Sequence, residues 1–111
     1  MNFLEYFKLY PVFRDKLHHS DAAPALQSAL AEMDSMLAQY IPENIDRRTE
    51  YRLSDEKAFI KLHCIEGKSV EKTAEDMCIS RDTAYRIRRR LCNKQIDGHL
   101  TAANRSTLGT V

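Results

Sequence analysis

Glycine and proline are scarce in this sequence: its 111 residues contain three of each, and tryptophan is absent. Folds built from many short strands need frequent turns, and turns use glycine and proline heavily. Long apolar runs are also missing, which argues against a membrane span, and the early Glu5 argues against a secretory signal. Abundant Ala, Leu, Glu, Lys and Arg favour helices, so we predict an all-α fold.

Three cysteines, Cys64, Cys78 and Cys92, follow one another at equal intervals of fourteen residues. This interval is not typical of metal ligands, and no Cys-x-x-Cys or His-x-x-x-His motif accompanies it. An odd number of cysteines without a secretory signal indicates free thiols and a cytoplasmic protein. A glycine-rich phosphate loop and paired catalytic acids are missing too. We therefore predict no catalytic residues, no metal, no cofactor and no enzymatic activity.

Charge is unevenly distributed, although the net charge is only +1. Residues 1–56 contain six Lys and Arg against ten Asp and Glu, whereas residues 57–111 contain eleven against six. The stretch 81–90 alone holds five arginines and one aspartate. Such asymmetry is typical of chains that contact nucleic acid through one region. A helix face that is merely solvated would give the same local count.

Residues 1–41 are predicted to form a helical hairpin. Asn2 is a suitable N-cap for the first helix, with Glu5 completing a capping box, and Pro11 should bend that helix or break it near residues 9–10. The second helix should begin near Ser20, Asp21 and Pro24 and end at residues 40–41. Both helices carry apolar residues at alternating spacings of three and four. The hairpin could pack on the rest of its own chain or form a dimerisation element.

The next segment, residues 42–53, is polar and is predicted to be a linker. Its three arginines, Arg47, Arg48 and Arg52, could contact phosphates or simply be solvated beside neighbouring acids. Ser54 is the expected N-cap of a helix that runs to residue 66 and ends at Gly67. Residues 54–96 then form the predicted C-terminal domain. The last residues, 97–111, are small and polar without a period, and we expect a flexible tail.

Residues 70–93 contain two short helical patterns separated by a tight turn. Ser69 is a suitable N-cap for the first, and Ser80 for the second. One apolar stripe contains Val70, Ala74 and Met77, and the other contains Ala84, Ile87 and Leu91. The opposite face of the second pattern is rich in arginine. A short helix, a turn and a basic second helix form a surface that fits a DNA major groove.

This stretch resembles a helix-turn-helix, most closely the region-4 type of bacterial sigma factors and small phage regulators of the ArpU-like type. The resemblance extends over about residues 53–95 and implies a three-helix head. It also implies that the helix at about 80–93 is the recognition helix. One position departs from the pattern, because Cys78 stands where such turns usually have glycine. A left-handed cysteine would cost about 1 kcal/mol, so the turn is expected to differ somewhat.

The resemblance implies a set of DNA-binding residues on and around the second helix. Arg81, Tyr85 and Arg86 are the expected base readers, since arginine can bind guanine through two hydrogen bonds. Phosphate contacts are expected from the other basic residues and from hydroxyls near the helix N-terminus, where Thr83 could alternatively serve as a local cap. The full set is Ser80, Arg81, Asp82, Thr83, Tyr85, Arg86, Arg88, Arg89 and Arg90.

Three functions are compatible with these expectations. The leading one is a small transcriptional regulator that binds double-stranded DNA as a homodimer and controls phage or mobile-element genes. The second is an interaction protein that uses a sigma-like head to bind RNA polymerase. The third is a DNA-recognition subunit of a phage packaging machine, which would need to assemble into a ring. No membrane partner is expected.

Overall fold

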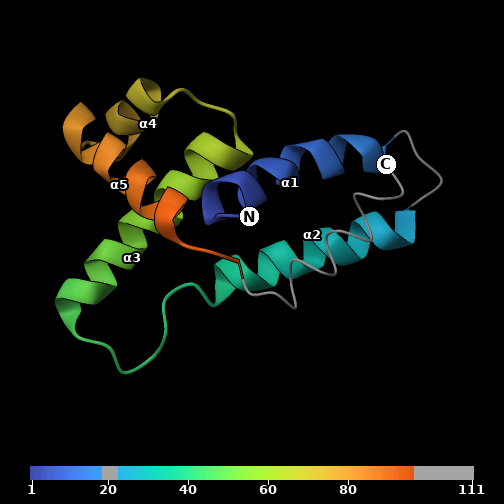
Figure 1. The fold of residues 1–111 in the computed structure, drawn as a ribbon, viewed down its shortest axis with the longest axis horizontal. Coiled ribbons are helices and arrows are strands. Elements are labelled where there is room, and N and C mark those ends of the chain that lie inside the picture. Colours follow the sequence, from blue (N-terminus) through green and yellow to red (C-terminus); the bar gives the residue numbers. More distant parts are fainter. Residues whose placement is uncertain (19–22, 97–111) are drawn as a thin grey trace.

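The computed structural model describes residues 1–18 and 23–96, and the regular elements of this part of the chain are all helices (Figure 1). Its elements are α1 (Phe3–Leu17), α2 (Ala23–Ala38), α3 (Arg47–Phe59), the π-helix η1 (Ile60–Ile65), α4 (Val70–Met77) and α5 (Arg81–Asn93). The predicted all-α class is thus confirmed. No helix among these residues is long and apolar enough to cross a membrane. The predicted flexible tail, residues 97–111, lies outside the described residues, as do Ser20 and Asp21.

The first two helices form the predicted hairpin and lie side by side (Figure 1). Asn2 accepts a hydrogen bond from the Glu5 amide at 2.8 Å, and the Glu5 carboxylate accepts one from the Asn2 amide at 3.4 Å, which confirms the capping box. α1 continues through Pro11 without a break. Proline removes only one helical hydrogen bond, and the fully buried Phe7 and Phe13 hold the helix on both sides of it.

Packing in the hairpin extends into the C-terminal helices. α1 contacts η1 and α5 as well as α2. Backbone hydrogen bonds join the two ends of the described chain, from the Phe3 amide to the Lys94 carbonyl at 2.9 Å and from the Ile96 amide to the Met1 carbonyl at 3.0 Å. The hairpin therefore packs through α1 on the C-terminal helices of its own chain, which was one of the two alternatives that the sequence left open.

The third helix begins earlier than predicted. α3 starts at Arg47, where Asp46 caps it by accepting hydrogen bonds from the Thr49 amide at 3.0 Å and the Thr49 hydroxyl at 2.6 Å. The expected linker 42–53 is thus half helical, and Ser54 is an exposed residue inside α3 and not its cap. Gly67 follows the end of η1 with a φ of 75°, which suits its predicted role at the helix end.

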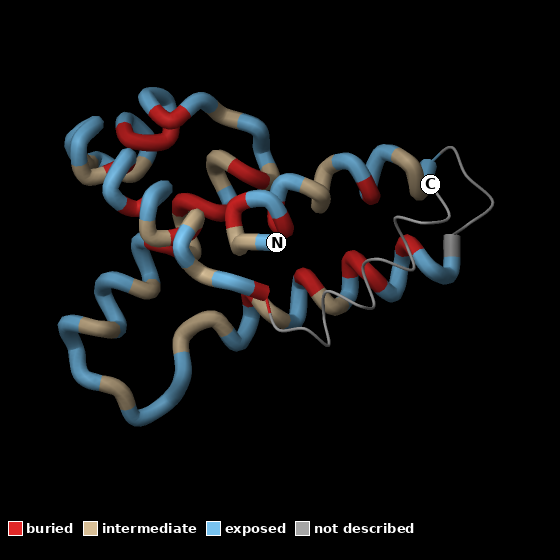
Figure 2. The backbone as a smooth tube through the Cα atoms, viewed as in Figure 1, coloured by how far each residue is buried: buried red, intermediate tan, exposed pale blue. Residues whose placement is uncertain are grey.

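The π-helical segment η1 contacts α1 of the hairpin as well as α3 and α4. Ile60 and Cys64 are buried there, whereas Leu62 and Ile65 are only half-buried. α1 covers one face of this segment. Buried residues from all the helices meet in one core (Figure 2). Its largest fully buried apolar side chains are Tyr6, Phe7, Phe13, Leu26, Met33, Phe59, Ile60, Ile87 and Leu91.

Candidate nucleic-acid interface

α4 and α5 form the predicted helix-turn-helix, and their caps are the predicted ones. Ser69 accepts a hydrogen bond from the Lys72 amide at 3.1 Å, and Ser80 accepts one from the Thr83 amide at 3.1 Å. Between the helices, Cys78 has φ 58° and ψ 42°, the left-handed conformation. The turn therefore keeps the geometry that glycine usually provides, with a cysteine in the strained position. The expectation of a different turn was wrong.

The buried face of α5 fixes which residues can point outward. Ala84, Ile87 and Leu91 are fully buried, as predicted, and in α4 Val70 and Ala74 are buried while Met77 is half-buried. Helical periodicity then places most of the other positions of α5 toward solvent. Six of the predicted DNA-binding residues are exposed on this helix: Arg81, Asp82, Tyr85, Arg86, Arg88 and Arg89.

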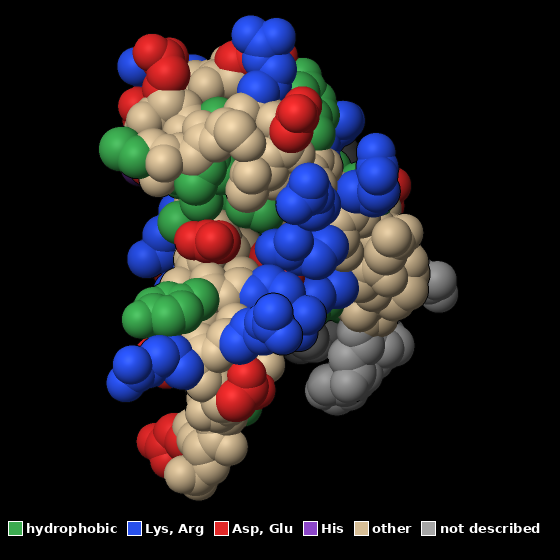
Figure 3. Space-filling view, turned by 90° about the vertical axis from the view of Figure 1, so that its left-hand side faces the viewer, with side chains coloured by type: hydrophobic (Ala, Val, Ile, Leu, Met, Phe, Trp, Pro, Cys, Tyr) green, Lys and Arg blue, Asp and Glu red, His purple; other side chains and the backbone are tan. Residues whose placement is uncertain are grey.

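Four exposed arginines of α5 form no ion pair within the described part of the chain: Arg81, Arg86, Arg88 and Arg89. Lys and Arg side chains gather in a band across the middle of the face made by α3, α4 and α5 (Figure 3). An unpaired guanidinium at the surface gains most from an anionic partner that approaches from solvent. These four arginines are therefore suited to bind phosphates.

Two of the predicted phosphate ligands are used locally instead. Besides accepting from the Thr83 amide, the Ser80 hydroxyl forms a hydrogen bond with the Thr83 hydroxyl at 2.8 Å. Ser80 and Thr83 therefore cap α5 together, which corresponds to the capping alternative considered for Thr83. Their role is to fix the start of the helix that carries Arg81 and Tyr85.

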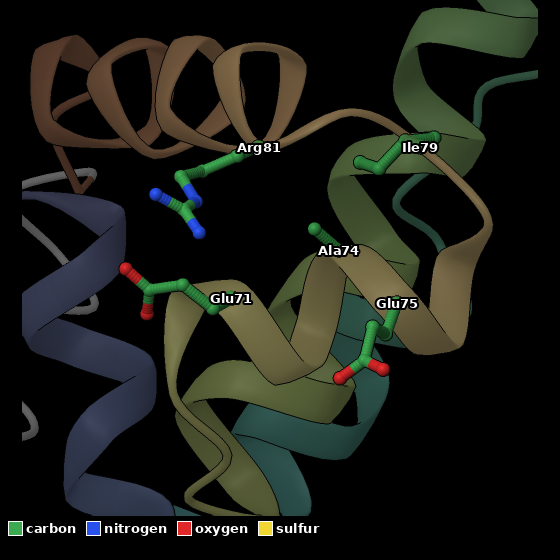
Figure 4. A pocket seen from close by; sticks show the side chains of 5 residues that line it. All are labelled: Glu71, Ala74, Glu75, Ile79 and Arg81. Carbon is green, nitrogen blue, oxygen red and sulfur yellow. The ribbon is translucent and has the colours of Figure 1, made fainter.

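Tyr85 contacts the other helix of the motif. Its hydroxyl donates a hydrogen bond to Oε1 of Glu71 in α4 at 2.7 Å, while the residue is 38% exposed. This hydrogen bond raises the pKa of Tyr85 and lowers the pKa of Glu71, and nearby Arg81 lowers the pKa of Glu71 further. Glu71 and Arg81 also line a pocket between α4 and the start of α5, where their charged ends point toward one another (Figure 4).

Arg90 differs from the other arginines of α5 because it is paired with an acidic residue. Its Nε donates a hydrogen bond to Oε2 of Glu56 at 3.0 Å, and the Glu56 side chain is only 1% exposed. Oε1 of the same carboxylate accepts hydrogen bonds from the Tyr40 hydroxyl at 2.7 Å and from Nζ of Lys94. The structure thus places Arg90 in an ion-pair network around the buried Glu56, whereas the sequence analysis grouped it with the DNA-binding arginines.

Sequence analysis missed the role of Glu56 altogether. Glu56 was expected in the first turn of a helix starting at residue 54, but it lies in the third turn of α3. Burial by itself would raise the pKa of its carboxyl group, yet the hydrogen bonds from Lys94, Tyr40 and Arg90 outweigh burial and the pKa is lowered. Burial, together with the hydrogen bond to the same carboxylate, raises the pKa of Tyr40. Glu56 thereby ties the end of α5 to α3 and to the segment after α2.

Comparison with known families agrees with this geometry. Residues 50–100 match the family model of the homeodomain-like domain, which covers somewhat less than half of the chain. The described part of this range, residues 50–96, contains the helix-turn-helix of α4 and α5. Such domains bind DNA through their second helix, so the match supports DNA as the partner. No curated protein and no solved structure matches the chain in the other two comparisons. The finer resemblance to sigma region 4 and ArpU-like regulators stays a prediction.

Proposed function

We propose that this protein binds double-stranded DNA sequence-specifically, with α5 in the major groove, and that it is a binding protein and not an enzyme. One observation carries the proposal. α5 buries one face completely through Ala84, Ile87 and Leu91 and presents on the other face arginines that form no ion pair within residues 1–18 and 23–96. A helix held in this way can enter a groove without unfolding or repacking, because its core contacts are already made.

The exposed residues divide into two groups by their place on α5. Arg81, Tyr85 and Arg86 lie in the first half of the helix, the end that reaches base edges in helix-turn-helix complexes, and are assigned as base readers. Arg88 and Arg89 lie in the second half and are assigned to phosphates. Arg90 was expected to contact phosphates as well, but it is left out of this group because it binds Glu56.

The biological role is that of a small transcriptional regulator of phage or mobile-element genes, and it acts as a homodimer. This part of the proposal rests on the resemblance to sigma region 4 and ArpU-like regulators and on the twofold symmetry of most helix-turn-helix sites. The apolar residues of the hairpin are buried within one chain, among them Phe13, Leu26 and Met33. A dimer would therefore use a surface other than the hairpin seam.

Binding of the purified protein to duplex fragments tests the proposal. Fluorescence anisotropy between about 50 and 200 mM salt should show a steep loss of affinity with salt, because arginines release counterions from phosphates. Arg86→Ala should reduce the preference for the best fragment. Arg14→Ala in α1 removes the same charge away from α5, and it should leave the preference unchanged.

Other outcomes of this experiment favour the other functions. A protein that binds no duplex at low salt contradicts the proposal, and RNA polymerase then becomes the partner to test by co-sedimentation. Analytical ultracentrifugation of the same sample measures the oligomeric state. A twofold assembly agrees with the proposed regulator, whereas a ring of many subunits indicates a packaging component.

A further inference from the structure

The first two turns of α3 carry a second basic surface. Arg47, Arg48 and Arg52 are exposed there, and none of them forms an ion pair within residues 1–18 and 23–96. Tyr51 lies among them and is 64% exposed, more than any other large apolar or aromatic side chain described. This part of α3 projects beyond α4 and α5, and its backbone is mostly exposed (Figure 2). Arginines interleaved with an exposed aromatic ring are typical of nucleic-acid surfaces.

Helical spacing connects this surface to α5. Arg48, Arg52 and Glu56 follow one another at intervals of four residues, so they lie along one side of α3. Glu56 is the residue that binds Arg90 in the second half of α5. The row formed by Arg48 and Arg52 therefore begins one turn away from the point where α3 meets α5. Through Glu56 and Arg90 the row is connected to the second half of α5, which carries the exposed Arg88 and Arg89.

Nearby acids do not neutralise the row. Asp46 is engaged in capping α3 through Thr49. Glu50 lies on a different side of the helix from Arg48 and Arg52, since it is two residues from each. Asp55 lies closer to the row, but no ion pair joins it to an arginine in the described structure.

We infer that the first two turns of α3 bind the sugar-phosphate backbone of the same DNA duplex that α5 reads. The inference rests on the proposed function. Charge complementarity, and the connection of the row to α5 through Glu56 and Arg90, identify phosphodiester groups as the ligand. Arg48 and Arg52 neutralise phosphates, and the Tyr51 ring packs on the backbone. Such contacts carry no sequence information but fix the orientation of the protein on DNA.

The test compares two double variants that remove the same charge. Arg48→Ala with Arg52→Ala removes the row, and Arg14→Ala with Lys16→Ala removes two cations from the far end of α1. Each phosphate contact contributes about 0.9 to the slope of log affinity against log salt. The α3 variant should therefore show a slope less steep by about 1.8, with an unchanged preference among fragments, whereas the α1 variant should keep the wild-type slope.

Several results would overturn the inference separately from the proposed function. If the wild type binds duplex and the α3 variant has the same slope of log affinity against log salt, α3 does not contact the DNA. The assignment of α5 as the recognition helix then still stands. A changed preference among fragments shows that α3 reads bases, contrary to a pure backbone contact. A wild type that binds no duplex contradicts the proposed function itself. Alanine favours helix at exposed positions, and circular dichroism of each variant verifies that it is folded.

Substitution by lysine adds a second measurement. Arg48→Lys with Arg52→Lys keeps both charges, so the salt slope should return to the wild-type value. If the salt slope of the lysine variant stays below the wild-type value, the two arginines do not contribute to binding by neutralising phosphates.

Discussion

The hydroxyl of Tyr85 in α5 donates a hydrogen bond to the Glu71 carboxylate in α4, with 2.7 Å between the two oxygens. Glu71 thereby holds an exposed aromatic ring of the proposed recognition helix in one position. A side chain fixed before binding loses less conformational entropy when it meets its ligand. Glu71 also lies close enough to Arg81 for that arginine to lower its pKa, so its negative charge opposes the approach of a phosphate.

Two substitutions of Glu71 should separate these effects. Glu71→Gln keeps a hydrogen-bond acceptor for Tyr85 but removes the charge, so overall DNA affinity should rise while the preference among fragments stays. Glu71→Ala removes both, so affinity should rise and the preference should fall by about 1 kcal/mol, or roughly fivefold. Anisotropy titrations with the preferred and a scrambled fragment measure both quantities. Equal preference in the two variants would show that the hydrogen bond does not set discrimination.

A second prediction concerns the buried Glu56 carboxylate. Glu56→Gln should lower the free energy of unfolding by about 3 kcal/mol near neutral pH, the lower end for breaking a buried ion pair. The lower end applies because the Arg90 and Lys94 side chains are 32% and 34% exposed and stay hydrated. Urea unfolding measures the loss. Glu50→Gln, in the exposed first turn of the same helix, should change stability by less than about 0.5 kcal/mol.

The pH dependence of this loss follows from the lowered pKa of Glu56. A carboxyl group whose pKa is lower in the folded state stabilises the protein above its ordinary value of 4.5, and the contribution disappears as pH falls through the folded-state pKa. The difference in unfolding free energy between wild type and Glu56→Gln should therefore narrow as the solution is acidified below that value. A constant difference down to strongly acidic pH would show that Glu56 is not linked to protonation.

Local signals in the sequence were sufficient to predict the helix-turn-helix. Ser69 and Ser80 cap their helices because each hydroxyl accepts a hydrogen bond from the amide three residues later. Ala84, Ile87 and Leu91 lie on one face because of the helical period alone. Such features depend on neighbouring residues, so they can be derived without the rest of the fold. The family match over residues 50–100 agrees with that derivation.

Features that depend on distant residues were not predictable in this way. The start of α3 was misplaced because both Asp46 and Ser54 are good N-cap residues, and only the structure shows that Asp46 acts with Thr49. Arg90 was grouped with the DNA-binding arginines because nothing local distinguishes it from Arg88 and Arg89. The distinction comes from Glu56, which is 34 residues away in sequence.

A third prediction follows from the left-handed backbone of Cys78, whose φ is 58°. Glycine adopts this conformation without a clash, so Cys78→Gly should raise the free energy of unfolding by about 1 kcal/mol. Cys78→Ala keeps the Cβ atom and should leave stability nearly unchanged, because the thiol is exposed. Thermal unfolding under reducing conditions compares the two. If Cys78→Ala raised the free energy of unfolding as much as Cys78→Gly does, the thiol and not backbone strain would be the cause of the lower wild-type stability.

The last prediction separates two arginines that are only two residues apart on α5. Arg90→Ala should destabilise the fold by about 2 kcal/mol, because it removes a charged hydrogen bond to the buried Glu56. It should leave the salt slope of DNA binding close to the wild-type value. Arg88 is exposed and forms no ion pair within the described residues, so Arg88→Ala should leave stability within about 0.5 kcal/mol and reduce the slope by about 0.9.

Combining variants provides the control for this prediction. If Arg90 acts through Glu56, Arg90→Ala in a Glu56→Gln background should cost much less stability than it does in the wild type, because the two substitutions remove the same interaction. Additive losses would contradict the ion pair as the cause. A salt slope that falls as far for Arg90→Ala as for Arg88→Ala would instead mean that DNA draws Arg90 away from Glu56, so that the guanidinium exchanges a buried carboxylate for a phosphate on binding.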